Sequence, residues 1–185
     1  LALLFPCPAT FAQKVAVAFY NCENLFDTID DPAKEDEEFT PAGRYHYTDY
    51  IYRKKLHNIA SVIQVMGGSD GPAIVGLVEI ENNTVLSDLV RQPELVARGY
   101  RYEWFEGPDP RSIDVALLYD PKRFKVIKAE PLPVDISSTG GKSITRDVLH
   151  VHGILLGDTV HVFVNHWPSQ RGGEEASESK RIIAA

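Results

Sequence analysis

Four polar residues in this sequence stand where apolar, strand-like segments begin or end: Asn21, Glu79, Asp114 and His166. Any one of them alone is explained as the cap of a strand end. Four together are hard to explain by packing, because buried strand faces are otherwise apolar. Ligands of open α/β sheets bind outside the carboxyl ends of the strands. We therefore expect these side chains to converge on one edge of a sheet and to form a reactive site.

Glu79 and Asn21 together offer one carboxylate and one amide oxygen, without a thiolate. Hard oxygen ligands of this kind suit a cation that keeps several waters in its shell. The residue types therefore predict Mg²⁺, with Mn²⁺ as the alternative, rather than a closed zinc site.

The segment Val162–Gly173 adds a histidine, an arginine and two glycines to the end of an alternating apolar strand. His166 offers a proton near neutral pH, and a neighbouring carboxylate would fix the tautomer of such a ring. Arg111 and Arg171 offer forked donors that could hold a phosphate while a metal neutralises developing charge. The alternative is a satisfied histidine at a strand end, followed by a glycine loop.

Positioning these residues requires a sheet, and the chain between them supplies its strands. Lys14–Asn21 alternates apolar and polar residues, and Ala73–Ile80 is almost continuously apolar, which is typical of strands. Between them, apolar residues recur at helical spacing from Asp49 to about Met66, with Thr48 as the N-cap. This order predicts a βαβ unit with two parallel strands. We expect its inner face to carry Val15, Val17, Val75 and Leu77.

A hairpin is predicted near the end of the chain, where Gly157-Asp158 separates strands over 149–156 and 159–165. This turn would pair Leu156 with Thr159. It places three histidines on one face: His150, His152 and His161. A polar outer face is favoured over a zinc site, because no acid or cysteine completes the set.

Composition and charge bound the class of protein. The chain has 185 residues, of which 44% are hydrophobic and 24% charged, as in an ordinary globular domain. The net charge of −7 argues against binding of nucleic acid by a broad basic surface, although not against local contacts to phosphate. No apolar stretch reaches the roughly 20 residues that a membrane span needs.

The first residues, Leu1–Ala12, resemble the apolar tail of a secretory signal with a cleavage point at Ala12. A frayed apolar N-terminus is the alternative. On the first interpretation, residues 13–185 belong to one domain of a secreted or periplasmic protein. Cys22 would then be the only cysteine left, so no internal disulfide could form.

Four motifs in this order resemble the endonuclease/exonuclease/phosphatase superfamily, and its secreted bacterial branch most closely. They are Phe-Tyr-Asn-Cys-Glu-Asn-Leu-Phe-Asp (19–27), Gly-Leu-Val-Glu-Ile-Glu-Asn (76–82), Arg-Ser-Ile-Asp-Val-Ala-Leu-Leu-Tyr (111–119) and Val-Asn-His-Trp-Pro-Ser-Gln-Arg-Gly-Gly (164–173). The resemblance implies an α/β fold, a four-layer sandwich of two mixed sheets face to face with helices outside. It also implies cleavage of phosphate esters with a divalent metal.

Roles carried over by motif agree with the chemistry of the residues. Asn21 and Glu79 resemble the metal-site pair of the first half of the family's domain. His166 is similar to the histidine that contacts the scissile phosphate in pancreatic-type deoxyribonucleases, and Asp114 lies near the position of its acidic partner. The phosphate-binding set is then expected to comprise Arg111, Asn165 and Arg171.

The sequence departs from the family's pattern after His166. The later Asp-x-Asn motif, which orients the attacking water, and the terminal Asp-His pair have no counterpart here. The resemblance therefore implies a fold incomplete at its C-terminus, the first part of an enzyme. We expect the 185-residue chain alone to lack the general base, to be nearly inert and to be aggregation-prone or partly molten.

The function expected from the resemblance is a secreted, Mg²⁺-dependent nuclease that cleaves phosphodiester bonds. Two alternatives remain open: a phosphomonoesterase acting on sugar, inositol or lipid phosphates, and a binding module that keeps the fold without catalysis. The expected partner is nucleic acid or another phosphate ester. No stable protein partner is expected, and the full-length protein should be a monomer.

Overall fold

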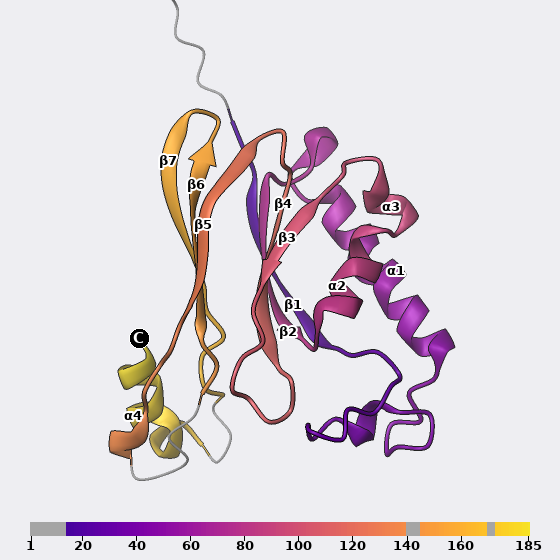
Figure 1. Ribbon diagram of the computed structural model, residues 1–185, viewed down its shortest axis with the longest axis vertical. Helices are drawn as coiled ribbons and strands as arrows, with labels where there is room; N and C mark the ends of the chain where they lie inside the picture. Colours follow the sequence, from indigo (N-terminus) through magenta and orange to yellow (C-terminus); the bar gives the residue numbers. More distant parts are fainter. Residues whose placement is uncertain (1–13, 140–144, 170–172) are drawn as a thin grey trace, which may run out of the picture.

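The computed structural model describes residues 14–139, 145–169 and 173–185, and it contains two β-sheets that face each other (Figure 1). The strands are β1 (Val17–Leu25), β2 (Ile74–Ile80), β3 (Arg101–Trp104), β4 (Asp114–Tyr119), β5 (Phe124–Leu132), β6 (Val148–Leu155) and β7 (Asp158–Val164). The helices are α1 (Asp49–Val65), α2 (Asn83–Val90), α3 (Pro93–Val96) and α4 (Glu174–Ala184). None of the helices in these residues is long and apolar enough to cross a membrane.

The first sheet has the strand order β1-β2-β4-β3, in which β1 and β2 are parallel and the other neighbours antiparallel. Helix α1 joins β1 to β2, so the predicted βαβ unit is confirmed. The second sheet, β5-β6-β7, is antiparallel throughout rather than mixed. The α/β fold with two sheets face to face is therefore confirmed.

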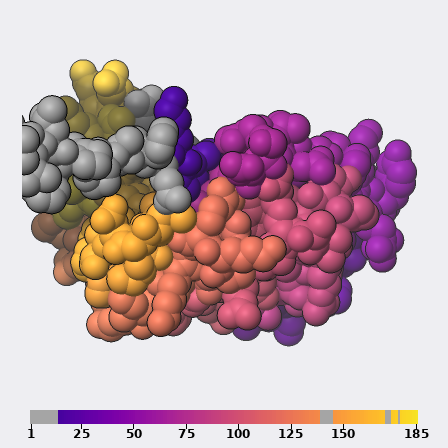
Figure 2. Space-filling model, turned by 90° about the horizontal axis from the view of Figure 1, so that it is seen from above, coloured from indigo at the N-terminus to yellow at the C-terminus, as the bar shows by residue number. Residues whose placement is uncertain are grey.

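Helices α1, α2 and α3 cover the outer face of the first sheet, whereas α4 lies beyond one end of the second sheet (Figure 1). Seen from above, the second sheet and the helix layer lie on opposite sides of the molecule (Figure 2). The helix layer and the two sheets thus form three successive layers, with the first sheet in the middle.

The middle sheet is buried on both faces, which explains why β2 is almost continuously apolar. On the helix side, Leu56 and Ile63 of α1 pack in one core with Val75 and Leu77. Between the sheets, a second core is formed by residues of both: Ile74, Val78, Val115, Leu117, Phe124, Leu149, Val151 and Val164.

The prediction that Val75 and Leu77 share the inner face with Val15 and Val17 is wrong. In the parallel register of β1 and β2, Val17 lies opposite Ile74. Neighbouring residues in register point to the same face, so Ile74 faces the second sheet and Val75 faces the helices. A shift of one residue moves every side chain to the other face.

The β6–β7 hairpin is present, but Leu155 rather than Leu156 ends its pairing, opposite Asp158. The turn is formed by Leu156 and Gly157, which have φ angles of 51° and 103°. Each residue of the predicted terminal pair is thus replaced by the residue before it. The two shifts together leave the same residues on each face, so the three histidines still share one face. The rings of His150 and His161 stack with their centroids 5.1 Å apart, and His152 stacks on His161 at 4.4 Å.

Candidate active site

Glu79 reaches the sheet edge through an irregularity in β2 that its sequence pattern does not show. Regular alternation places Glu79 on the helix side with Val75 and Leu77, as expected from the sequence. Instead Glu79 has a φ of 62°, and the pairing of β2 with β4 shifts between Val78 and Ile80. Ile80 therefore fills the helix-side core in its place. Such a β-bulge re-aims a side chain next to many active sites.

The Glu79 carboxylate lies among donors from other segments. Asn21 Nδ2 donates to Glu79 Oε1 over 3.0 Å, and Asn24 N donates to Oε2 over 2.9 Å. His166 Nε2 lies 3.4 Å from Oε1. The bond from His166 lowers the pKa of Glu79 most, burial opposes it and Asn21 adds to the lowering, which leaves the pKa at about 2. Glu79 is therefore an ionised carboxylate at neutral pH.

Asn21 is fixed by the end of β1, where the backbone turns sharply. Glu23 and Asn24 have φ angles of 52° and 63°, and Glu23 N donates to Asn21 Oδ1 over 2.7 Å. Lys55 of α1 donates to the carbonyl oxygen of Glu23. This turn directs Asn24 N to Glu79, so the two strand ends are held together by side chains.

Asp114, the first residue of β4, lies at the same edge, because it is paired with Ile80 of β2. It is 3% exposed, and its Oδ1 accepts from Gly107 N over 3.1 Å. Asp114 Oδ2 and His166 Nδ1 are both buried without a partner among the described residues. Burial is the main cause that raises the pKa of Asp114 to about 6. The expected pairing of Asp114 with His166 is thus replaced by Gly107 on one side and Glu79 on the other.

Arg111 is held by Asp109 in the loop between β3 and β4. Arg111 Nε and Nη2 donate to the two Asp109 carboxylate oxygens over 3.1 and 2.8 Å. Arg146 Nε lies 3.3 Å from Asp109 Oδ2, with its side chain only 11% exposed. The hydrogen bond to Asp109 is the main cause that raises the pKa of Arg111, and burial is the main cause that lowers the pKa of Arg146. The negative charge of Glu79 makes a smaller, raising contribution to both. The structure thus places two cations near Glu79.

Arg146 is a site residue that sequence reasoning missed. It stands two residues before β6, in Thr-Arg-Asp, with no periodicity or motif that marks it. Two further phosphate contacts were predicted, Asn165 and Arg171. Asn165 Nδ2 donates to the carbonyl oxygen of Phe163 over 3.3 Å, and Arg171 lies outside the described residues.

The donor set at this edge fits a hydrated magnesium ion. Glu79 supplies an ionised carboxylate, and Asn21 supplies an amide oxygen that accepts one bond from Glu23 N and has a second lone pair; both are hard ligands. In the described part of the chain, no three His, Cys, Asp or Glu side chains are grouped to hold a metal by themselves. Mg²⁺ tolerates such a site because it keeps most of its waters, whereas structural zinc needs four protein ligands.

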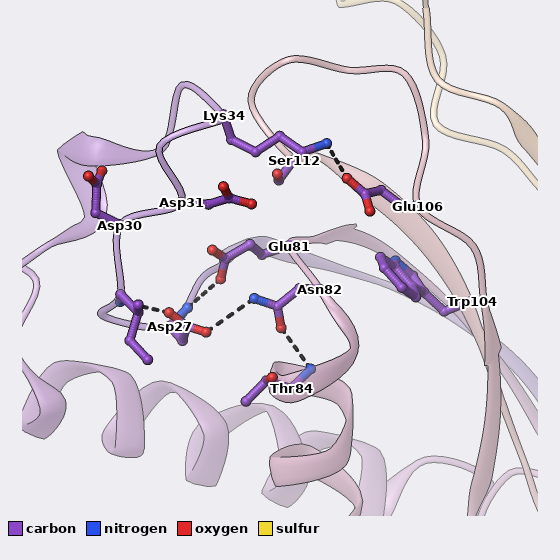
Figure 3. Close-up of a pocket in the computed structure, with 11 residues that line it drawn as sticks. Asp27, Asp30, Asp31, Lys34, Glu81, Asn82, Thr84, Trp104, Glu106 and Ser112 are labelled. Atoms are coloured by element: carbon purple, nitrogen blue, oxygen red, sulfur yellow. Dashed lines mark hydrogen bonds and ion pairs between the residues drawn. The ribbon is translucent and has the colours of Figure 1, made fainter.

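A pocket of about 270 Å³ adjoins this edge, lined by the acidic loop after β1 and by the starts of α2 and β4 (Figure 3). Asp27 joins these parts: its backbone N donates to Glu81 Oε2 over 2.6 Å, and its carboxylate accepts from Asn82 over 3.1 Å. Trp104 forms one wall, and Lys34 is ion-paired with Glu106 at the rim. Burial raises the pKa of Glu81 to about 8. The pocket is therefore polar and predominantly acidic.

Comparison with solved structures finds the same fold at low sequence identity. An endonuclease/exonuclease/phosphatase family protein from Bacteroides thetaiotaomicron matches with a TM-score of 0.53 and 16% identity over 80% of this chain and 48% of that one. A mannosyl-6-phosphatase from the same species matches with a TM-score of 0.53 and 16% identity over 81% and 50%. ANGEL2, a 2′,3′-cyclic phosphatase, matches with a TM-score of 0.52 and 14% identity over 76% and 38%.

The chain thus spans half or less of the length of these structures. A search of curated proteins gives no match. The model of the endonuclease/exonuclease/phosphatase family matches residues 16–185, nearly the whole chain. By fold and by this match, the chain belongs to the endonuclease/exonuclease/phosphatase family, whose members hydrolyse phosphate esters.

Proposed function

We propose that this chain provides the metal-binding and phosphate-binding side of a Mg²⁺-dependent phosphoester hydrolase, with Mn²⁺ as the alternative ion. The observation that carries the proposal is the convergence of Asn21 and His166 on the ionised Glu79, beside the paired Arg111 and Arg146. A carboxylate, an amide and a histidine with nearby cations match what binding and cleaving a phosphate ester require.

Each residue has a distinct task in this mechanism. Glu79 and Asn21 would hold the ion, which would supply Lewis-acid polarisation of a phosphoryl oxygen. His166 donates a hydrogen bond to the phosphate and stabilises its developing charge. Arg111 and Arg146 neutralise the remaining oxygens through their guanidinium groups. The attacking water is expected to be oriented by the family's later Asp-x-Asn motif, which has no counterpart after His166 in this sequence.

For the substrate we propose a phosphodiester, and thus a nuclease, as the sequence resemblance implies. A small phosphate monoester is the second candidate, and the pocket beside the site favours it. Asp27, Asp31 and Glu106 line this pocket, and carboxylates repel the further phosphates of a nucleic acid strand. The mannosyl-6-phosphatase with the same fold supports the second candidate by analogy.

The apolar segment Leu1–Ala12 supports the proposal that the protein is secreted or periplasmic. The resemblance to the family's bacterial secreted branch supports it as well. We further propose that the full-length protein is a monomer that acts alone on its substrate.

The decisive experiment is a substrate panel with the full-length protein in Mg²⁺, in Mn²⁺ and in EDTA. Plasmid DNA, RNA and bis-(p-nitrophenyl) phosphate represent diesters, and p-nitrophenyl phosphate and sugar phosphates represent monoesters. Turnover of any of these that EDTA abolishes supports the proposal. Phosphate binding without turnover of any ester would instead support the binding module.

A further inference from the structure

Asp109 is a buried carboxylate to which the sequence assigns no role. It lies in the loop between β3 and β4 and is 7% exposed. Its Oδ1 accepts from both Arg111 N and Arg111 Nε, over 3.0 and 3.1 Å, and its Oδ2 accepts from Arg111 Nη2 over 2.8 Å. Arg146 Nε lies 3.3 Å from the same Oδ2. One carboxylate therefore hydrogen-bonds to Arg111 and lies within ion-pair distance of Arg146, which comes from a distant segment and whose buried Nε has no hydrogen-bond partner among the described residues.

Asp109 is itself fixed by the loop that carries it. Its carbonyl oxygen accepts from Ser112 N over 3.1 Å, and the next residue, Pro110, accepts from Glu35 N over 2.7 Å. The loop is thus closed on itself and attached to the acidic segment after β1. The backbone of Asp109 is therefore held by contacts that do not involve the two guanidinium groups.

The contacts of Asp109 leave the outer parts of both guanidinium groups available. Arg111 is held along its Nε and Nη2 edge, and Arg146 lies near Asp109 through Nε. A guanidinium has five N–H donors in a planar fork, so each group keeps donors for an anionic oxygen. The described residues offer no other carboxylate contact within ion-pair distance to either arginine.

Without a carboxylate between them, the two cations would repel each other. Arg146 is mostly buried, so its charge is removed from water, and without Asp109 no nearby carboxylate would offset that cost. Asp109 reduces both costs and keeps the pair near Glu79, whose charge acts on both arginines. An arrangement formed before the substrate arrives does not have to be assembled when it binds.

We propose that Asp109 is a positioning residue that holds Arg111 and Arg146 together as a preformed receptor for the phosphate of the substrate. The inference rests on the proposed phosphoester hydrolase function and adds to it the residue that organises phosphate binding. Asp109 itself does not touch the phosphate, because like charges repel. It acts through the two guanidinium groups.

The test compares Asp109→Asn with a matched control at the opposite end of β4. There Asp120 holds Arg123 in a similar pair, with Nε 2.8 Å from Oδ2, far from Glu79. Asp120→Asn therefore breaks an equivalent ion pair without touching the proposed receptor. Asp109→Glu, which keeps the charge, serves as the rescue variant. All variants are made in the full-length protein and first compared by thermal melting.

Two readouts separate positioning from a purely structural role. The first is the dissociation constant of inorganic phosphate, measured by calorimetry in Mg²⁺. The second readout is the separate effect of each substitution on KM and on kcat, measured with an ester that the wild type hydrolyses. Loss of folded protein lowers the apparent kcat at unchanged KM, whereas misplaced arginines raise KM as well.

We expect Asp109→Asn to weaken phosphate binding and kcat/KM by about 10- to 100-fold, as loss of an orienting group does elsewhere. Asp120→Asn should leave both within about twofold of the wild type, and Asp109→Glu should recover part of the loss. Equal effects of Asp109→Asn and Asp120→Asn, or unchanged or tighter phosphate binding in Asp109→Asn, would overturn the inference. If the wild type neither binds phosphate nor cleaves any ester, the proposed function itself fails.

Discussion

At the scale of single residues, the site depends on a strained backbone at Glu79. A φ of 62° is unfavourable for a glutamate, and it persists only where surrounding contacts determine it. Three donors, from Asn21, Asn24 and His166, converge on the carboxylate and provide those contacts. The strain thus turns an ionised group toward the sheet edge, where a cation can reach it.

Removal of the Glu79 charge should abolish metal binding. We expect a weak Mg²⁺ affinity in the wild type and the loss of most of it in Glu79→Gln. An amide does not neutralise the charge of the cation and binds it less strongly than a carboxylate. Calorimetry measures both affinities. Glu81→Gln is the matched control two residues away. The pKa of Glu81 is raised to about 8, so it is largely uncharged at pH 7 and Gln should leave the affinity unchanged. Equal affinity in Glu79→Gln and the wild type would remove Glu79 from the metal site.

Asp114 should make the fold less stable as the pH rises. Its pKa is raised from 3.8 to about 6, so the folded state binds the proton more tightly than the unfolded state. The contribution of Asp114 to the free energy of unfolding is therefore fully present below about pH 4 and is lost as the pH rises to above 6. The difference between the folded and unfolded pKa values corresponds to a loss of about 3 kcal/mol.

We expect Asp114→Asn to melt at a higher temperature than the wild type at pH 8 and at a similar one at pH 4. Hydrolytic activity should fall in the same variant, since Asp114 lies at the reaction edge. Urea unfolding at both pH values checks the prediction. If the stability of Asp114→Asn differed from that of the wild type by the same amount at pH 4 and pH 8, the raised pKa of Asp114 would be contradicted.

At the scale of elements, the two sheets are in contact at the start of β5, beside its neighbour β6. Phe124 is fully buried there and packs edge-to-face on Tyr119 of the first sheet, with centroids 5.7 Å apart at 86°. Gly153 of β6 provides the room, because a Cβ at this position would lie 2.5 Å from the Phe124 ring. The ring and a glycine together set the distance between the layers.

Gly153→Ala should therefore destabilise the fold by about 2 kcal/mol, because neither the ring nor the nearby carbonyl oxygen of Lys125 can move aside. Gly76→Ala in β2 is the control. Its Cβ would meet Phe19 at 3.2 Å, but Phe19 is 58% exposed and can turn away. We expect a cost below about 1 kcal/mol there. Denaturant melts that rank the two variants in the opposite order would contradict this account of the packing.

At the scale of the whole molecule, one side of the sandwich is open. Within the described residues, β1 is one of the two edge strands of the first sheet and β7 one of the two of the second. Val17 and Phe19 of β1 are 59% and 58% exposed, although they point toward the second sheet. Apolar side chains beside an unpaired strand edge are a template for association with another chain.

We expect the 185-residue chain, expressed alone, to self-associate as its concentration rises. Phe19→Thr should reduce the association, since it removes an exposed aromatic ring while keeping a residue that favours strands. Light scattering after size-exclusion chromatography measures the effect. Thr159→Ser, at the hairpin of β7, is a control expected to change nothing. A chain that stays monomeric at high concentration would show that the exposed edge is harmless.

The sequence by itself determined most of the elements and part of the set of residues at the site. Helical spacing predicted a helix from Asp49 to about Met66, and the structure has one from Asp49 to Val65. The apolar run over 73–80 became β2, parallel to β1 as its connection through a helix required. Such patterns are local, because burial acts on each strand and helix with the period of its own backbone.

Only the tertiary structure decided how these residues are grouped. The alternation in β2 assigned Glu79 to the helix side, and a bulge that depends on pairing with β4 reversed it. Asn21 and Glu79 are 58 residues apart, and no local pattern encodes their hydrogen bond. Asp109 and Arg146 come together in the same way, from a loop and a strand start without a motif. Composition and period thus fix which side chains are available, whereas long-range strand pairing decides which of them meet, because it depends on contacts that no single segment contains.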